Sequence, residues 1–162
     1  MTKTKTMSKL LNTFDINDCS ILLIDWASKD FREKWKDQLI EAIKEFDHEN
    51  TEIDNTLRNV IGIKINDTVD LDWYKNKAFV YILVYNDKII GFSYCGTRKT
   101  KIQYGSNVCF IYELYIDKNY RRLGLATYLM DYVVTARKKE ESYIKAVSLN
   151  VREDNIIAKK DV

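Results

Sequence analysis

The residues best suited to bind an anion form a short basic turn, Arg121-Arg122-Leu123-Gly124-Leu125-Ala126. The turn opens a helix-like segment, and the first backbone N–H groups of a helix have no acceptor within it. These donors lie at the positive end of the helix dipole, where phosphate groups bind. Gly124 and Ala126 are small, so a ligand can approach the backbone closely. The turn therefore predicts a diphosphate site; the alternative is an ordinary strand–turn–helix in which Gly124 only eases packing.

A second candidate for chemistry is Glu113, a carboxylate in the middle of an apolar, strand-like run. Burying a carboxylate is costly unless the group is paired or used. Glu113 is therefore a candidate general base that takes a proton from an amine, directly or through a water. Its neighbour Tyr112 could position a substrate or donate a proton. The alternatives are a solvated edge charge for Glu113 and a core role for Tyr112, and no motif selects a general acid from Tyr120, Tyr128 and Tyr143.

Two strands and one helix must position these residues. Apolar, β-branched and aromatic residues alternate from Phe110 to Ile116, which predicts a strand. From Leu125 the apolar residues fall at helical spacing. Lys145–Val151 alternates again, and a strand–helix–strand unit of this length predicts a parallel, right-handed crossover. A last helix is expected at Asn155–Lys160.

The preceding residues predict one more strand and a long helix. Ile21–Ile24 is a short strand, and Ser28 or Asp30 can cap the helix that follows. Residues 47–57 are polar and predict a loop with at most one helical turn, and 57–72 is ambiguous between helix and strand. The apolar face of the helix consists of Phe31, Trp35, Leu39, Ala42, Ile43 and Phe46.

A hairpin joins this helix to the central strand. Its strands are Ala78–Tyr85 and Lys88–Thr97, with Asn86-Asp87 as the turn. Gly91 predicts a bulge or a close backbone approach, and 98–107 predicts a cationic loop. Together these elements predict a single α/β domain over residues 1–162, with a mixed sheet, helices on both faces and disorder in residues 1–9.

The composition limits the classes of function. The chain has 162 residues and a net charge of +2, which does not favour nucleic-acid binding, and no apolar run is long enough to span a membrane. The single histidine, His48, argues against a histidine-based triad or a zinc site. Cys19, Cys95 and Cys109 form no metal pattern, and two of them lie in apolar strand contexts that indicate buried thiols, so a reducing, intracellular compartment is expected.

The spacing Arg-x-x-Gly-x-Ala from Arg121 to Ala126, between a strand and a helix, resembles the GNAT superfamily of acyl-CoA-dependent N-acetyltransferases. The resemblance runs from about Ala78 to the end of the chain. It implies the GNAT fold, in which the central strand splays from its parallel neighbour and the acyl-pantetheine of acetyl-CoA lies in the gap; no metal is implied. The cofactor-binding residues that it implies are Leu114, Tyr115, Ile116, Arg121, Arg122, Leu123, Gly124, Leu125, Ala126, Thr127 and Asn155.

A narrower resemblance is to the protein N-terminal α-amine acetyltransferases, among which the NatD type, which acetylates histones, is closest. It rests on Tyr112-Glu113-Leu114, the basic turn, the hairpin Ala78–Phe92 and Asn155. It implies direct attack of an α-amine on acetyl-CoA with Glu113 as the general base, in the cytoplasm or the nucleus. The loop 98–107 is cationic where the NatD-type loop is acidic, which argues against a basic histone tail as substrate.

Two other functions remain open. One is a GNAT enzyme for a small amine such as a polyamine, an amino sugar or an amino acid. The other is a degenerate domain that binds CoA without turnover, because GNAT folds usually add two strands after the last helix and these are expected to be missing here. The sheet edge at Lys145–Val151 would then be uncovered, which predicts a homodimer.

Overall fold

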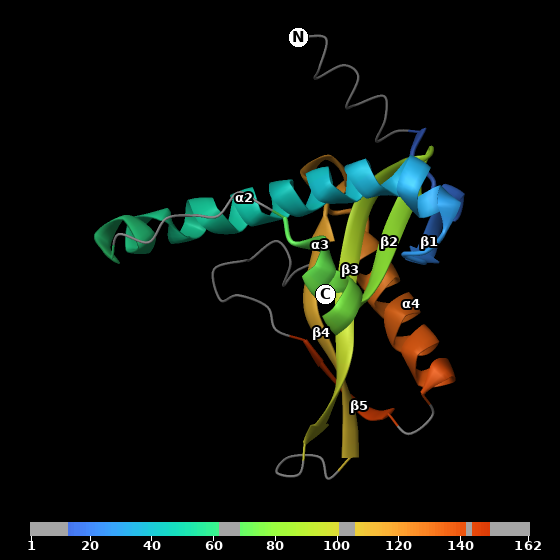
Figure 1. Ribbon diagram of the computed structural model, residues 1–162. Coiled ribbons are helices and arrows are strands. Elements are labelled where there is room, and N and C mark those ends of the chain that lie inside the picture. The colour runs from blue at the N-terminus through green and yellow to red at the C-terminus, as the bar shows by residue number, and fades with distance from the viewer. Residues whose placement is uncertain (1–12, 62–68, 101–105, 142–143, 150–162) are drawn as a thin grey trace.

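The computed structural model describes residues 13–61, 69–100, 106–141 and 144–149 (Figure 1). Its strands form one sheet in the order β1-β2-β3-β4-β5. In chain order the elements are η1 (Ile16–Asp18), β1 (Cys19–Leu23), η2 (Phe31–Trp35), α2 (Lys36–Ile61), α3 (Leu71–Lys77), β2 (Phe79–Tyr85), β3 (Lys88–Thr100), β4 (Ser106–Ile116), η3 (Lys118–Tyr120), α4 (Leu125–Glu140) and β5 (Ile144–Leu149).

The sheet is mixed, as the sequence predicts. Neighbours from β1 to β4 pair antiparallel, whereas β4 and β5 pair parallel across the α4 crossover. The predicted strands and the helix after the basic turn are all present. β3 and β4 extend further than expected, so the predicted loop 98–107 is strand up to Thr100 and again from Ser106. The GNAT-like α/β architecture is thereby confirmed.

The hairpin turn and Gly91 behave as their residue types dictate. Asn86 and Asp87 have φ values of 50° and 58°, as the two central residues of a type I′ turn require. β3 carries one extra residue, Ile90, next to Gly91. A Cβ atom on Gly91 would lie 2.7 Å from the carbonyl oxygen of Tyr115, so both features predicted at this glycine are found.

The long N-terminal helix is longer than predicted. Ser28 caps its start, because the Ser28 Oγ accepts the N–H of Phe31 at 3.0 Å. One π-helical turn, η2, leads into α2, which crosses one end of the sheet and extends beyond it (Figure 1). The prediction of a loop at 47–57 is therefore wrong. The stretch holds no glycine or proline, and Ile53 and Leu57 keep the four-residue spacing of a helix.

The short helix α3 was not predicted. Of the ambiguous stretch 57–72, the residues up to Ile61 belong to α2, and α3 begins at Leu71. Asp70 caps α3, since its Oδ1 accepts the N–H of Trp73 at 3.3 Å. α3 brings Trp73 and Tyr74 onto the face of the sheet that α2 also covers (Figure 1).

Two apolar cores lie on opposite faces of the sheet. On one face, α4 buries Leu125, Leu129 and Val133 against strand residues such as Ile111. On the other face, η2 and α2 bury the predicted helix stripe, including Leu39, against the sheet. Helices therefore cover both faces, as expected.

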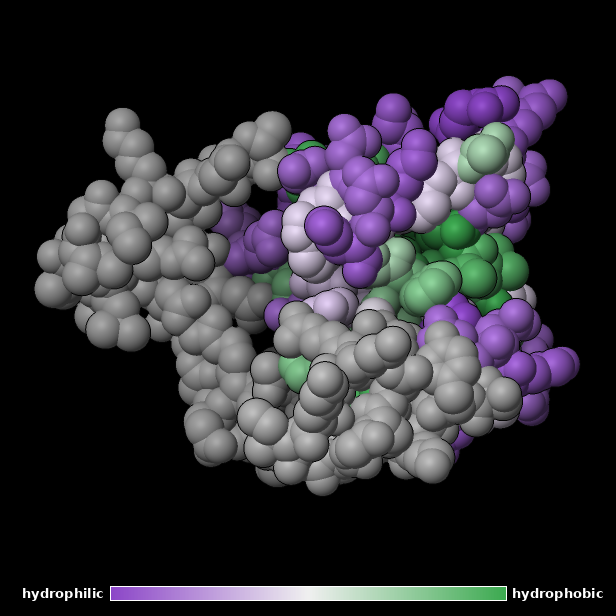
Figure 2. Space-filling view, turned by 60° about the horizontal axis from the view of Figure 1, so that its bottom comes forward, coloured by the Kyte–Doolittle hydropathy of each residue, from purple (hydrophilic) through white to green (hydrophobic). Residues whose placement is uncertain are grey.

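Cover is incomplete at the β1 edge of the sheet. Large apolar side chains that are more than a third exposed include Leu22 and Leu23 of β1 and Phe79 of β2. Figure 2 shows an apolar area of the surface framed by polar side chains. Among the described helices, none combines the length and the apolar character needed to cross a membrane.

Some predictions fall outside the described residues. The described pairing of β4 with β5 ends at Ile111 opposite Leu149. The last helix with Asn155, and the expected absence of the strands after it, concern residues 150–162, which the structure does not describe.

Substitution of Gly91 tests the close approach of β3 and β4. In Gly91→Ala the new methyl group would meet the Tyr115 carbonyl oxygen at 2.7 Å and the Ile116 Cδ1 atom at 2.9 Å. We expect the free energy of unfolding, measured by urea denaturation, to fall by about 1–3 kcal/mol. Ser20→Ala, at an exposed position of β1, is the control and should change it by less than about 0.5 kcal/mol. Equal stability of the two variants would contradict the strand spacing.

Candidate functional site

The basic turn has the backbone geometry of an anion-binding loop. Gly124 caps the start of α4 in the left-handed conformation, with φ 76° and ψ 13°. Among the described residues, apart from its two chain neighbours, no atom would lie within 4 Å of a Cβ atom on Gly124, which leaves room for a ligand above the turn. The first intrahelical bond runs from the N–H of Tyr128 to the Gly124 carbonyl at 3.1 Å. Helical geometry therefore directs the N–H groups before Tyr128 toward the open end of α4.

The side chains of the turn divide into buried and exposed ones. Leu125 and Ala126 are buried in the α4 core, and Leu123 packs against it, so these residues can offer a ligand only backbone groups. Arg122 is exposed and has φ 65°, an uncommon value for a residue other than glycine. Thr127 is half-buried in the first turn of α4. These features fit a diphosphate held by backbone donors with a cationic side chain at its rim.

Arg121 points to α2 rather than over the turn. Its Nη2 atom lies 2.6 Å from the Glu49 carboxylate, and its Nε donates to the Ile116 carbonyl oxygen at 2.9 Å. The guanidinium also lies 5.7 Å from the centre of the Tyr115 ring. In this arrangement Arg121 can serve a phosphate with its backbone, while its side chain joins the turn to α2 and β4.

A bulge in β4 sets the direction of the candidate base. Ile111 lies opposite Cys95 of β3. The next paired residue is Glu113, opposite Tyr94, so Tyr112 is an extra residue in β4. Side chains alternate along a strand, so Glu113 shares a face with Tyr115, which is buried in the α2 core. Glu113 is thus on the face covered by α2 and α3, and it is partly exposed.

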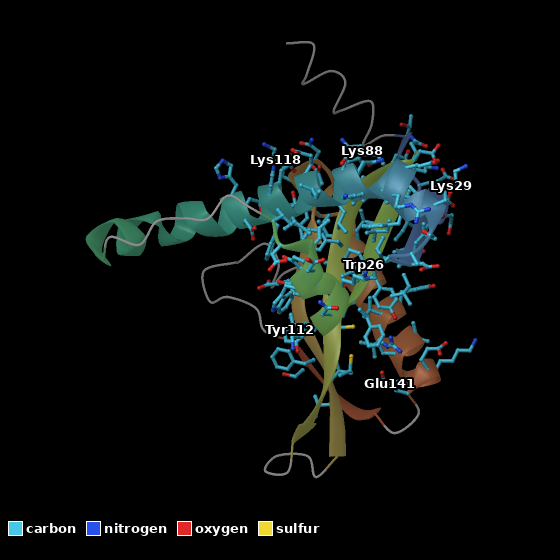
Figure 3. All side chains as sticks on the ribbon, viewed as in Figure 1. Trp26, Lys29, Lys88, Tyr112, Lys118 and Glu141 are labelled. Atoms are coloured by element: carbon cyan, nitrogen blue, oxygen red, sulfur yellow. The ribbon has the colours of Figure 1, made fainter. Side chains whose placement is uncertain are left out.

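Aromatic side chains from three segments surround this position. Trp73 lies 5.8 Å from Tyr94 and 6.1 Å from Tyr112, between ring centres, and Tyr94 stacks on Tyr112 at 5.9 Å. Tyr74 is 4.9 Å from Tyr94. Figure 3 shows Tyr112 close to α3 on this face. We call Trp73, Tyr74, Tyr94 and Tyr112 the aromatic face.

Carboxylates lie near the hydroxyl groups of the aromatic face. The rings of Tyr74 and Tyr94 are adjacent, with 4.9 Å between their centres, and each residue influences the pKa of the other. Burial, followed by the charges of Asp47 and Glu113, raises the pKa of Tyr74 to about 12. Burial also raises the pKa of Tyr94, with Tyr74, Glu113 and Asp47 adding to the effect. Both hydroxyls therefore stay protonated at neutral pH, in an environment that attracts cations.

The remaining predicted site residues end β4. Leu114 packs against the α4 core, whereas Tyr115 faces α2 and donates its hydroxyl to the Glu45 Oε2 at 3.1 Å. Ile116 is buried, and its carbonyl oxygen accepts the hydrogen bond from the Arg121 Nε. These three residues follow Ile111, the last residue of β4 with a described partner in β5, and acyl-pantetheine binding by their backbone stays a prediction.

Several predicted residues have other surroundings or are not described. Tyr120, considered as a general acid, is buried with ring contacts to Tyr85, and Tyr128 packs against the α4 core. Tyr143 and Asn155 lie outside the described residues. Within the described parts of the chain, no three His, Cys, Asp or Glu side chains are grouped to hold a metal ion.

Sequence reasoning missed the residues that α2 and α3 bring to the site. Glu45 and Glu49 are one turn apart on α2, but only a helix extended past 46 places Glu49 beside the turn. Trp73 and Tyr74 form an adjacent aromatic pair, and the capping Asp70 three residues before Trp73 could have indicated their helix.

Comparison with known proteins agrees with this geometry. The sequence profile of the Acetyltransferase (GNAT) family matches residues 21–160. A search of curated protein sequences found no significant match.

Solved structures with a similar fold share little sequence with the chain. A ribosomal-protein-alanine N-acetyltransferase from Brucella melitensis biovar Abortus 2308 has a TM-score of 0.62 at 14% identity, covering 88% of this chain and 86% of that one. An aminoglycoside acetyltransferase from an uncultured soil metagenomic sample, in complex with sisomicin, has a TM-score of 0.57 at 17% identity, with 89% and 84% covered. A possible acetyltransferase from Clostridium difficile 630 has a TM-score of 0.56 at 20% identity, with 88% and 85% covered.

Substitution of Gly124 tests the turn as the acetyl-CoA site. In Gly124→Arg a long side chain would fill the open space above the turn, and its left-handed backbone would cost about 1–2 kcal/mol. We expect titration calorimetry to show no acetyl-CoA binding. Thr135→Arg adds the same side chain at an exposed position of α4 and should bind as the wild type does. Binding retained by Gly124→Arg would refute the assignment of the turn.

Proposed function

The chain belongs to the GNAT acetyltransferase family, and we propose that this acetyl-CoA-dependent enzyme acetylates protein N-terminal α-amines with Glu113 as its general base. The observation that carries the proposal is the position of Glu113. The bulge at Tyr112 turns Glu113 toward the aromatic face, three residues before the end of the strand that leads to the Gly124 turn.

The donor would lie along β4 and the turn. A strand advances about 3.3 Å per residue, so Glu113 is roughly 10 Å before Ile116 along β4. An extended pantetheine arm can cover this distance from a diphosphate at the Gly124 turn. The backbone of Leu114, Tyr115 and Ile116 would hold the arm, and Arg122 and the N–H groups at the start of α4 would hold the diphosphate.

The acceptor would enter over the aromatic face. A protonated amine is attracted both by the faces of aromatic rings and by carboxylates. The exposed fraction of Trp73 is 42%, so its ring is available to an acceptor residue, while Tyr94 beneath it is buried. The likeness to a ribosomal-protein-alanine N-acetyltransferase supports a protein α-amine as the acceptor, and the Tyr112-Glu113-Leu114 strand supports the N-terminal type. The NatD type within it stays part of the proposal.

The reaction is direct transfer. Glu113 takes a proton from the amine, directly or through a water, and the neutral nitrogen attacks the thioester carbonyl. The carbonyl oxygen becomes an oxyanion, which backbone N–H donors can stabilise. The C–S bond then breaks, and the CoA thiolate takes up a proton as it leaves. The products are the acetylated amine and CoA.

A small cationic amine is the second candidate acceptor. A hollow of about 310 Å³ lies between α2, the β2–β3 hairpin and the end of β4. Its carboxylates belong to Asp37, Glu41, Glu45 and Asp117. They favour a polycation, and one similar structure is an aminoglycoside acetyltransferase. The hollow does not contain Glu113 or the aromatic face, so we rank this candidate second.

A panel of acceptors tests the proposed substrate. Release of CoA is measured with peptides that carry free N-termini, with the same peptides blocked at the N-terminus, and with polyamines, amino sugars and amino acids. We expect release with free peptides and none with blocked ones. Release with small amines alone would transfer the proposal to the second candidate, and no acceptor-dependent release would favour a domain that binds CoA without turnover.

Substitution of Glu113 tests the general base. Glu113→Gln keeps the shape of the side chain but cannot accept the proton, so we expect kcat to fall by about 10²-fold or more with little change in acetyl-CoA affinity. Glu140→Gln, at an exposed position of α4, should leave kcat unchanged. Unchanged turnover in Glu113→Gln would remove Glu113 from the mechanism.

A further inference from the structure

We propose that Glu49 of α2 is a positioning residue that holds the diphosphate-binding turn in place through Arg121. The inference rests on the proposed role of the Gly124 turn in binding acetyl-CoA. The Glu49 Oε2 accepts from the Arg121 Nη2 at 2.6 Å, and the Arg121 Nε donates to the Ile116 carbonyl oxygen at 2.9 Å. One guanidinium therefore ties together α2, the last residue of β4 and the first residue of the turn.

The turn needs such support because its backbone is strained. Arg122 has φ 65°, an unfavourable value for a residue other than glycine, and Gly124 also has a positive φ. Only a well-anchored segment keeps this conformation in the absence of ligand. Leu123 anchors one side of the turn in the α4 core, and Arg121 anchors the other on α2.

The contact between α2 and the turn is firmer than an ordinary surface ion pair. The side chains of Arg121 and Glu49 are 22% and 37% exposed, so water screens them only in part. One turn earlier on α2, Glu45 accepts the hydroxyl of Tyr115 at 3.1 Å. Two carboxylates spaced four residues apart therefore hold α2 on the end of β4 and on the turn.

An opposite effect of Glu49 must be weighed against this one. A carboxylate near a diphosphate is repulsive, and removing it would leave the Arg121 guanidinium available to the ligand. A released arginine, however, samples many rotamers and loses this conformational freedom when it binds a ligand. Backbone N–H groups that are already fixed in the turn lose no such freedom when they bind the ligand. Loosening the turn should therefore weaken acetyl-CoA binding more than the freed charge of Arg121 strengthens it.

Kinetics of Glu49→Gln test the proposal, with acetyl-CoA as the varied substrate. We expect the KM and the calorimetric Kd for acetyl-CoA to rise about fivefold, which corresponds to about 1 kcal/mol. The kcat at saturation and the KM for the acceptor should stay at wild-type values, a division that general destabilisation would not produce. The control is Glu33→Gln, an exposed carboxylate of η2 that pairs only weakly with Lys29, at 3.9 Å.

A double-mutant cycle identifies Arg121 as the link. In an Arg121→Gln background, Glu49→Gln should raise the Kd for acetyl-CoA no further, because its partner is already absent. An unchanged or lowered Kd in Glu49→Gln, or full additivity of the two changes, would overturn the proposal. Should Glu49→Gln fail to fold, Arg121→Lys keeps the charge, loses the forked contact and should raise the Kd likewise.

The proposed function and this inference fail in different ways. Acetyl-CoA binding that survives Gly124→Arg removes the turn from the donor site, and with it both claims. Binding that depends on Gly124 but not on Glu49 leaves the function in place and overturns the positioning role alone.

Discussion

The register of β4 against its two neighbours is the constraint on which the site depends. β3 pairs with β4 along its length, and the only shift in that pairing is the extra residue Tyr112. The described pairing with β5 stops one residue earlier, at Ile111. Because of this bulge, Glu113 faces the aromatic side, while the strand continues through Ile116 into the turn.

The helices on the two faces have different tasks. α4 supplies the N-terminal donors above Gly124 and buries its own apolar residues against the sheet. α2 holds the opposite side, where Glu45 and Glu49 contact the end of β4 and the turn, and Asp47 influences the tyrosines of the aromatic face. The segment 45–49 of α2 therefore contacts the Gly124 turn and also lies near the aromatic face. The Glu49–Arg121 pair also neutralises charge where an acidic helix adjoins an anion site.

Local patterns predicted the parts of the fold that local interactions determine. Alternation from Phe110 to Ile116 gave the central strand, and the glycine-containing turn before Leu125 gave the start of α4. The failures have a different origin. The polar residues after 46 predicted a loop, but they belong to α2. A helix that extends beyond the sheet needs no apolar face there, only residues with adequate helix propensity.

The candidate site was predictable to the extent that it depends on backbone geometry. The spacing indicated a small residue that a ligand can approach, and Gly124 is open above; its left-handed backbone conformation was not predicted. The direction of Arg121 was not, because its partners Ile116 and Glu49 are five and 72 residues away. The bulge at Tyr112 could not be predicted either, because it arises from the pairing of β3 with β4 and neither strand has a local pattern that indicates it. Tertiary contacts of this kind have no local signal.

The surroundings of Glu113 also bear on which form of the amine reacts. Tyr74 and Tyr94 keep their protons, because burial and the nearby carboxylates raise the pKa of both hydroxyls. They can therefore act as neutral hydrogen-bond groups but not as bases, which supports the proposal that Glu113 accepts the proton. The same carboxylates attract the amine as a cation, yet only the neutral amine can attack. In the proposed mechanism, a base beside the aromatic face resolves this conflict: the carboxylates attract the cationic acceptor, and Glu113 takes its proton next to the thioester.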